Sequence, residues 1–178
     1  MATYLAFLRA INLGAKRTFP KDAIVAATEA AGFTDVATHI NTGNVRLTTR
    51  MRSRARIEAA LEKAYLADRG FEVPSFVFTG QEVLAIARDA EEIVAEQGYE
   101  GVHYISLLKD TPTAAARREV EALSTDTERV VVRGRGAHLL LGESYHESRL
   151  SNAAMEKRLG PATARNVTVI RALATKWC

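Results

Sequence analysis

The sequence predicts an α+β fold, and three observations carry that prediction. Short β-prone segments alternate with helical ones in the order strand, helix, hairpin, helix, strand. The same order of elements starts again near residue 80. Glycine-containing turns join neighbouring β-prone segments, so the sheets are antiparallel. We therefore expect two ferredoxin-like subdomains, over residues 1–80 and 81–178, with helices packed on one face of each sheet and helices at the C-terminus.

The elements of the first half follow from apolar patterning and from end signals. Proline at the start of a helix and glycine just after its end are the expected pair, and a serine side chain caps a helix start. In order, the predicted elements are the strand Thr3–Leu8, the helix Pro20–Ala31 before Gly32, the hairpin Val36–Thr49, a helix from Ser53 to Gly70, and the strand Val73–Thr79.

The hairpin has Thr42-Gly43 as a two-residue turn, because glycine supplies the positive φ that a tight turn needs. This turn places Asn41 opposite Asn44 and continues outward along both strands. Side chains alternate across a strand, so the hairpin has one apolar face and one polar face. The apolar face consists of Val36, Thr38, Ile40, Val45 and Leu47, and the polar face of His39, Asn41, Asn44 and Arg46. The polar face is a candidate binding platform.

The second half repeats this layout without sequence identity to the first. Its predicted elements are a helix from Thr79 to Gly98, the strand Val102–Leu108, a helix from Thr111 to Leu123, the hairpin strands Arg129–Arg133 and Ala137–Leu141, a helix from Ser148 or Ser151 to Gly160, and a last helix from Thr163. The second hairpin turns at Gly134-Arg135 and places His138 with Arg129 and Arg133 on the face opposite the core.

Composition is that of a globular protein, with 47% hydrophobic and 25% charged residues. No apolar run reaches the ~18 residues that a membrane span needs. The start of the chain reads as a strand rather than a signal peptide, and the single Cys178 excludes an internal disulfide, so we expect a cytoplasmic protein. Five arginines between residues 46 and 56, with no acid among them, form either a solvated loop or a phosphate-attracting edge.

Two further segments are candidate anion sites. The loop after the first strand carries Arg9, Gly14 and Lys16, which suit a close backbone approach to a negative charge, although a plain connection explains it too. The segment Ser148–Lys157 starts a helix with serine, arginine and asparagine donors, and ordinary capping is the alternative. Arg165-Asn166 would join this second site if two helix ends lie side by side.

Catalytic and metal-binding motifs are poorly supported. The four histidines, His39, His103, His138 and His146, are scattered, and no nucleophile elbow is present. Glu91, Glu92 and Glu143 fit surface carboxylates better than an acid–base pair, and no ligand pair has a recognised metal spacing. The sequence predicts no cofactor and no metal.

Four motifs, in order along the chain, resemble the bacterial family called domain of unknown function sixteen ninety-seven. They are Phe7–Lys16, Ile40–Val45, Ser148–Gly160 and Thr163–Asn166. The resemblance implies the two-subdomain α+β fold and brings no established activity. It indicates the ligand-binding candidates, which are Arg9, Asn12, Gly14, Lys16, Asn41, Gly43, Asn44, Arg149, Asn152, Lys157, Arg165 and Asn166.

Three hypotheses of function remain open at this point. The asparagine, arginine and lysine content of the candidate set favours a binding module for a phosphate-bearing small molecule or nucleic acid. The same residues also fit a purely structural polar junction in a protein-interaction module. The third hypothesis is a small enzyme that acts on a phosphorylated or nucleotide-like substrate. The sequence predicts no membrane partner and leaves the ligand and the oligomeric state open.

Overall fold

The computed structural model describes residues 1–142 and 148–178, so Glu143 and His146 lie outside the described residues. The chain divides into two compact units. The N-terminal unit is Met1–Gly80 with Trp177, and the C-terminal unit is Gln81–Lys176 with Cys178.

The N-terminal unit has the strand order of a ferredoxin-like sheet. Its elements are β1 (Ala2–Leu8), the 3-10 helix η1 (Ala15–Arg17), α1 (Lys21–Ala30), β2 (Thr34–His39), β3 (Asn44–Thr49), α2 (Arg54–Arg69) and β4 (Ser75–Thr79). The sheet is antiparallel in the order β2-β3-β1-β4. Ser53 caps α2 by accepting from the Arg56 amide, and Gly70 ends it in the left-handed conformation, as the sequence predicts.

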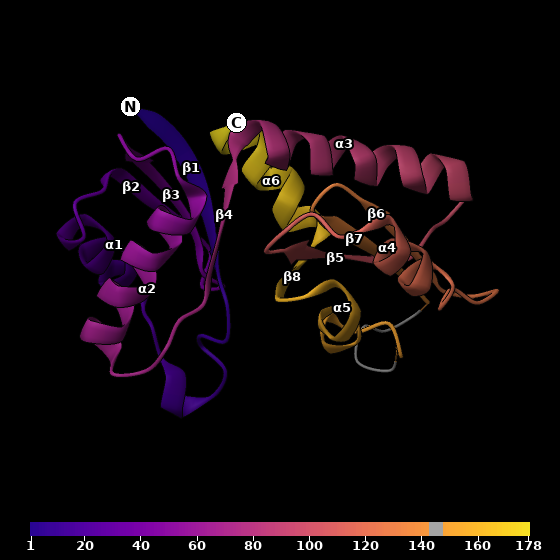
Figure 1. The fold of residues 1–178 in the computed structure, drawn as a ribbon, viewed down its shortest axis with the longest axis horizontal. Helices are drawn as coiled ribbons and strands as arrows, with labels where there is room; N and C mark the ends of the chain where they lie inside the picture. Colours follow the sequence, from indigo (N-terminus) through magenta and orange to yellow (C-terminus); the bar gives the residue numbers. More distant parts are fainter. Residues whose placement is uncertain (143–147) are drawn as a thin grey trace. The chain divides into compact units, whose positions relative to one another are not determined.

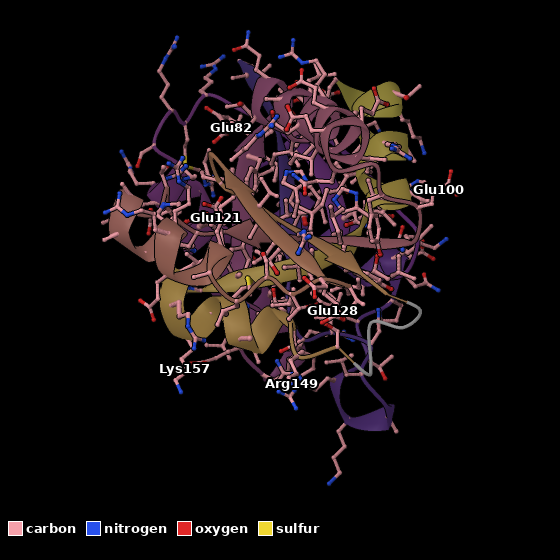
Figure 2. All side chains as sticks on the ribbon, turned by 90° about the vertical axis from the view of Figure 1, so that its right-hand side faces the viewer. Glu82, Glu100, Glu121, Glu128, Arg149 and Lys157 are labelled. Atoms are coloured by element: carbon pink, nitrogen blue, oxygen red, sulfur yellow. The ribbon has the colours of Figure 1, made fainter. Side chains whose placement is uncertain are left out.

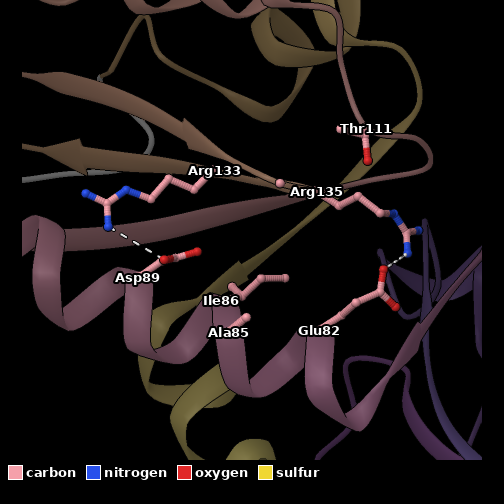
Figure 3. Close-up of a pocket in the computed structure, with 8 residues that line it drawn as sticks. Glu82, Ala85, Ile86, Asp89, Thr111, Arg133 and Arg135 are labelled. Carbon is pink, nitrogen blue, oxygen red and sulfur yellow. Dashed lines mark hydrogen bonds and ion pairs between the residues drawn. The ribbon is translucent and has the colours of Figure 1, made fainter.

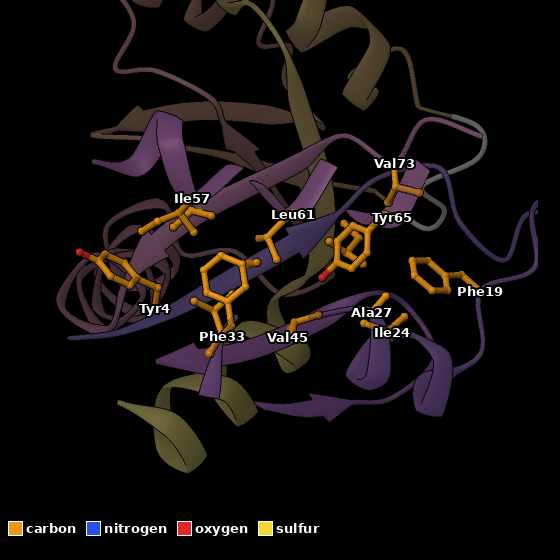
Figure 4. Packing of buried hydrophobic residues seen from close by; sticks show 14 of the residues in the cluster. Tyr4, Phe19, Ile24, Ala27, Phe33, Val45, Ile57, Leu61, Tyr65 and Val73 are labelled. Atoms are coloured by element: carbon orange, nitrogen blue, oxygen red, sulfur yellow. The ribbon is translucent and has the colours of Figure 1, made fainter. Parts of the chain in front are cut away.

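Helices α1 and α2 cover one face of this sheet and form its core (Figures 1 and 4). Ile24 of α1 and Ile57 and Leu61 of α2 are fully buried against β1 and β3. The Tyr65 hydroxyl lies 2.7 Å from the Thr28 hydroxyl and so joins the two helices inside the core. Burying that many apolar side chains is the main free-energy term that fixes α1 and α2 on the sheet.

The C-terminal unit repeats the same topology and adds two helices. Its elements are α3 (Gly80–Gln97), β5 (Val102–Leu108), α4 (Ala114–Glu121), β6 (Arg129–Arg133), β7 (Gly136–Leu141), α5 (Asn152–Leu159), β8 (Ala162–Asn166) and α6 (Val167–Trp177). The sheet order β6-β7-β5-β8 matches that of the first sheet position by position. Helices α4 and α5 lie on one face, and α3 and α6 lie on the other (Figure 1). The α+β prediction is confirmed.

The segment Ala162–Asn166 is a strand, where the sequence analysis predicted a helix from Thr163. The pattern Thr163-x-x-Asn166 resembles a helix start, but tertiary pairing overrides that local signal. The strand pairs antiparallel with β5, from Ala162 opposite Leu108 to Asn166 opposite Tyr104. Asn166 then caps α6, because its side-chain Oδ1 accepts from the Thr168 amide at 2.9 Å.

The first hairpin also differs from the prediction. The observed pairs are His39 with Asn44 and Thr38 with Val45, so residues 40–43 form a four-residue connection. Ile40 adopts φ 50° and is 44% exposed, so it leaves the strand and the apolar face. The register moves by an even number of residues, which leaves Val45 and Leu47 on the core face as expected. The second hairpin has the predicted two-residue turn, with Arg133 opposite Gly136.

The faces opposite the two helix-packed cores are not open polar platforms. Asn44 is fully buried, and β1 and β4 place Phe7 and Phe78 on the same face, with their rings in edge contact at 5.6 Å. In the C-terminal unit His138 is fully buried as well. Asn44 and His138 are therefore interior residues, whereas His39, Arg46, Arg129 and Arg133 are half-buried. In the part of the chain that the structure describes, no helix is both long and apolar enough to cross a membrane.

Candidate functional site

The loop after β1 (residues 9–19, the first loop) and the β2–β3 connection (residues 40–43, the hairpin turn) are held against each other. The Leu8 amide donates to the Gly43 carbonyl at 2.7 Å, and Asn12 Nδ2 donates to the Asn41 carbonyl at 2.8 Å. A Cβ on Gly43 would lie 2.7 Å from the Leu8 Cβ, so only glycine permits this approach. Two segments that the sequence analysis singled out separately thus form one site.

Asn12 acts as the frame of the first loop. Its Nδ2 also donates to the Phe19 carbonyl at 3.2 Å, and its Oδ1 accepts from the Phe19 amide at 2.8 Å. Phe19 is fully buried and packs edge-on against Tyr65, with ring centroids 5.2 Å apart. The Asn12 amide is therefore saturated by main-chain groups, and its role at the site is to position the loop.

Arg17, which was not among the predicted residues, fastens the other side of the loop. Its guanidinium donates to the carbonyls of Ala10 and Glu72 and lies over the Phe71 ring at 4.6 Å from the centroid. The main-chain N–H of Asn12 in turn donates to the Arg17 carbonyl at 2.8 Å. Its neighbour Lys16 is exposed in η1. The sequence does not distinguish Lys16 from Arg17 as an anion ligand. Only the fold shows that Arg17 is bound to main-chain carbonyls of its own unit.

Unusual backbone conformations concentrate at this site. Ala10, Asn12 and Ile40 have φ values of 56°, 55° and 50° without being glycine, and Ile40 is β-branched. Gly14 and Gly43 add φ values of 72° and 74° in the same two segments. Each left-handed non-glycine residue costs on the order of 1 kcal/mol, and such strain gathers at functional sites.

A pocket of about 550 Å³ lies between the first loop, the hairpin turn and the start of α1. Three predicted residues, Asn12, Gly14 and Asn41, line it together with Thr18, Pro20, Lys21 and Asp22, which the sequence analysis did not single out. Lys21, Asn41 and Thr18 are exposed, whereas Asn12 is half-buried. Leu13 and Ile40, which adjoin lining residues in the chain, are exposed by 69% and 44%.

The electrostatics of the pocket favour a negative charge at the start of α1. The residue before α1 is Pro20, which has no side chain to cap the helix, and the Ile24 amide makes the first intrahelical bond, to the Pro20 carbonyl. The amides before Ile24 therefore point out of the helix as donors, and the helix dipole adds partial positive charge there. Lys21 adds a full charge, and Asp22 in the first turn opposes it.

Other predicted residues are bound into the N-terminal unit itself. Asn44 Nδ2 donates to the His39 carbonyl at 3.0 Å and to the Thr42 hydroxyl at 2.9 Å, closing the hairpin turn from inside. The Arg9 amide donates to the Pro74 carbonyl at 2.9 Å, tying the start of the first loop to the segment before β4. Neither Arg9 nor Asn44 lines the pocket.

In the C-terminal unit the predicted residues do not form the expected common site. Asn152 Nδ2 donates to the Ala162 carbonyl at 3.1 Å, and its Oδ1 accepts from the Ser106 hydroxyl at 2.9 Å, so it joins α5 to two strands. Arg165 lies on β8, not at a helix start, and donates to the Thr163 hydroxyl at 3.0 Å. Burial lowers the Arg165 pKa to about 10, so it stays charged at neutral pH.

Arg149 and Lys157 are exposed and extend away from the C-terminal unit (Figure 2). Ser151, rather than Ser148, caps α5 by accepting from the Ala154 amide at 3.2 Å. The helix start therefore has the ordinary cap that the sequence analysis gave as the alternative. The pocket at the first loop is lined by none of Arg149, Asn152 and Lys157.

A second hollow, of about 150 Å³, lies between α3 and the β6–β7 turn (Figure 3). Arg135 is 5% exposed in its side chain, and it donates to the Leu108 carbonyl at 3.0 Å and to Glu82 Oε1 at 3.0 Å. Arg133 pairs with Glu92 at 3.0 Å and with Glu96 at 2.8 Å, and lies 3.6 Å from Asp89. Acidic residues of α3 thus neutralise both arginines and fasten the helix to the sheet.

Two buried histidines lie on the same face of this sheet. His103 of β5 and His138 of β7 are 35 residues apart, yet His103 Nε2 lies 3.2 Å from His138 Nδ1. Burial, with Arg171 nearby, lowers the His103 pKa to about 4. Burial, with His103 and Arg133 nearby, lowers the His138 pKa to about 3. Both rings are neutral at pH 7, and no cluster of three or more metal-ligating side chains occurs in residues 1–142 and 148–178.

The chain is an α+β protein of two ferredoxin-like units, and its first unit carries a pocket beside a loop with left-handed non-glycine residues. The model of the family described as "Protein of unknown function (DUF1697)" matches residues 1–137, and the chain belongs to this family. The predicted resemblance is therefore confirmed. No curated protein matches the chain.

A solved structure has the same fold. The conserved bacterial protein SP0830 from Streptococcus pneumoniae is similar, with a TM-score of 0.71, over 98% of this chain and 97% of that chain. The two sequences are 16% identical, so this likeness shows the shared fold alone.

Proposed function

We propose that this protein is a binding module for a phosphate-bearing small molecule of nucleotide size, held in the pocket between the first loop and the hairpin turn. The observation that carries the proposal is the start of α1, which has no side-chain cap and whose residues Pro20, Lys21 and Asp22 line a pocket of about 550 Å³. A volume in this range suits a small ligand, and helix starts favour phosphate groups.

The rest of the pocket suits the remainder of a nucleotide. Asn41 and Thr18 of the lining offer hydrogen bonds to a sugar or base edge, and Pro20 offers an apolar contact to a ring. Amides, a hydroxyl and an ammonium group bind such a ligand without providing a nucleophile activated by a base. The lining therefore supports binding more directly than it supports the enzyme hypothesis.

The experiment is calorimetric titration with adenosine mono-, di- and triphosphate, inorganic phosphate and adenosine. We expect binding of the phosphorylated compounds and none of adenosine, because the phosphate supplies the charge that the α1 start stabilises. Lys21→Gln should weaken that binding about tenfold, whereas Lys63→Gln, an exposed lysine on α2 outside the pocket, should leave it unchanged. Equal affinity of both variants, or no binding at millimolar ligand, would overturn the proposal.

The structural hypothesis keeps support for part of the candidate set. Asn44 and Asn152 make side-chain hydrogen bonds within their own units, to main-chain carbonyls and to the Thr42 and Ser106 hydroxyls. We propose that these two residues stabilise the fold and do not contact the ligand. Alanine variants should then melt at lower temperature and keep their affinity for phosphorylated compounds.

A further inference from the structure

Positive charge is distributed unevenly along the chain. Residues 1–80 carry eleven lysines and arginines against seven acids, a net charge of +4, whereas residues 81–178 carry thirteen against fourteen, a net charge of −1. Within the first half, residues 36–57 contain five arginines and no aspartate or glutamate. The excess of the whole chain thus originates in one short stretch.

This stretch forms a defined edge of the N-terminal unit. Arg50 and Arg52 lie in the segment between β3 and α2, separated by Met51, and Arg54 and Arg56 lie in the first turn of α2. We name these four residues the arginine edge. Arg50, Arg52 and Arg56 are exposed, and among the described residues none of the three has an acidic partner.

The C-terminal unit shows that such pairing is available to arginines of this protein. Arg133 alone has three acidic neighbours on α3. Arg158 and Glu119 are also paired, at 3.3 Å. The arginine edge has no such neutralisation for Arg50, Arg52 and Arg56, so its field extends into solvent.

The position of Arg56 at the start of α2 is locally unfavourable. The first turn of a helix carries partial positive charge and favours acidic side chains, yet the first turn of α2 contains no acid. An external anion relieves this repulsion and gains the helix dipole as well. A separate hollow of about 280 Å³, lined by Ala2, Thr49, Arg50 and Arg52 together with Met1, gives an anion space beside Arg50 and Arg52.

We propose that the arginine edge binds the phosphate backbone of double-helical nucleic acid. Guanidinium groups match phosphate oxygens with paired donors, and all four cations of the edge are arginine rather than lysine. No aromatic residue occurs in residues 46–57, so the edge has no platform for unstacked bases, and charge density favours the duplex over a single strand.

A membrane surface fits the edge less well. Met51 packs against the core of the N-terminal unit and Ile57 is fully buried, so among the described residues Met1 is the one large apolar side chain exposed beside the edge, and a single side chain gives little apolar area for insertion between lipids. The edge is also separate from the nucleotide pocket. The pocket adjoins Gly43 before β3, and the edge begins at Arg50 after it, about 20 Å away along the strand.

The test is binding of a fluorescent duplex to the full-length protein across a salt series. The affinity should fall as salt rises, with a slope of log K against log salt of about −3 to −4 if the edge contacts about four phosphates. The variant Arg50→Gln, Arg52→Gln, Arg56→Gln should bind at least tenfold more weakly at low salt, with a slope about 3 closer to zero.

A matched control removes the same charge elsewhere. Arg88→Gln, Arg117→Gln, Arg118→Gln changes three exposed arginines of the C-terminal unit and should bind the duplex within twofold of the unaltered protein. Equal loss in both variants, no duplex binding at low salt, or binding to phosphatidylserine vesicles without duplex binding would overturn the proposal. Thermal unfolding at an unchanged midpoint establishes that each variant is folded.

One further arm separates this proposal from the nucleotide pocket. Lys21→Gln should keep its duplex affinity, and excess adenosine triphosphate at constant ionic strength should not displace the duplex. Failure of the pocket then leaves the edge intact, and failure of the edge leaves nucleotide binding intact. If adenosine triphosphate displaces the duplex from the unaltered protein and fails to displace it from Lys21→Gln, the duplex binds at the pocket. That result would overturn the arginine edge as the duplex site.

Discussion

His103 of β5 and His138 of β7 form a buried pair, in which His103 Nε2 lies 3.2 Å from His138 Nδ1. A neutral imidazole has one donor and one acceptor nitrogen, so one shared hydrogen bond satisfies both rings on that side. A proton on either ring would bring a charge into the interior beside a second imidazole and Arg133. The fold therefore favours the neutral form of the pair.

This pair makes the stability of the C-terminal unit depend on pH. Well above pH 6.5, the ordinary histidine pKa, both histidines are neutral whether folded or unfolded, and they do not affect the dependence. Below that pH the unfolded chain binds protons that the folded chain rejects until pH approaches about 4 for His103 and about 3 for His138. The free energy of unfolding should fall on acidification by on the order of 1 kcal/mol per pH unit for each histidine.

Urea unfolding between pH 7 and pH 4 measures this slope. The double variant His103→Leu, His138→Leu removes both titrating groups and should have a smaller slope than the unaltered protein. An unchanged slope in the double variant would show that carboxylates, and not the histidines, cause the acid sensitivity.

The contact between Glu82 and Arg135 should contribute to stability because the arginine is almost fully buried. Glu82→Gln keeps the size of the side chain and removes its charge, which leaves a 5%-exposed guanidinium without its carboxylate. Glu82 is 35% exposed, so solvent screens part of the effect, and we expect a loss of about 1–2 kcal/mol. Glu91→Gln, at an exposed pair 3.9 Å from Arg171, is the control and should change the free energy of unfolding by less than about 0.5 kcal/mol.

Gly43→Ala should be the most damaging glycine substitution at the candidate site. The new Cβ would meet the Leu8 Cβ at 2.7 Å and Ile11 Cδ1 at 2.9 Å, at a φ of 74°. We expect a loss of about 2–4 kcal/mol from strain and overpacking together. Gly134→Ala has a φ of 53° with nothing within 4 Å, so it should cost about 1 kcal/mol. Thermal unfolding compares the two, and similar losses would contradict the close approach of the hairpin turn to β1.

Asp22→Asn should strengthen the binding of a phosphate-bearing ligand in the pocket. Asp22 is the acid of the first turn of α1, where it competes with an anion for the same amides. Removing its charge should raise the affinity for adenosine diphosphate a few-fold at low salt, with a smaller effect at high salt. Asp68→Asn, on α2 and paired with Arg69, is the matched control. A weaker affinity in Asp22→Asn would place the phosphate elsewhere.

Local signals predicted much of the fold because they act within a few residues. The Ser53 cap, the Gly70 end and the Gly134-Arg135 turn are all set by their own backbone chemistry. Strand β8 was missed because Thr163 and Asn166 have the spacing of a helix start, and only pairing with β5, more than 50 residues earlier, overrides it. The first hairpin register was wrong because Ile40 takes a left-handed conformation that a β-branched residue rarely adopts.

The candidate site was predictable in part for the same reason. The sequence analysis singled out Asn12, Gly14 and Asn41, which the structure places at one pocket. It did not single out Lys21 and Asp22, because a helix start shows its charge field only when another segment faces it. The partnership of His103 and His138 has no local signal either, since a long-range strand pairing creates it.

The repetition of one strand order in two units has a consequence for synthesis on the ribosome. Every pairing of the first sheet joins residues between Ala2 and Thr79, and every pairing of the second joins residues between Val102 and Asn166. A nascent chain therefore holds all the hydrogen-bonding partners of its first sheet before any strand of the second is translated. Such segregation keeps unpaired strand edges of one sheet from capturing strands of the other during folding.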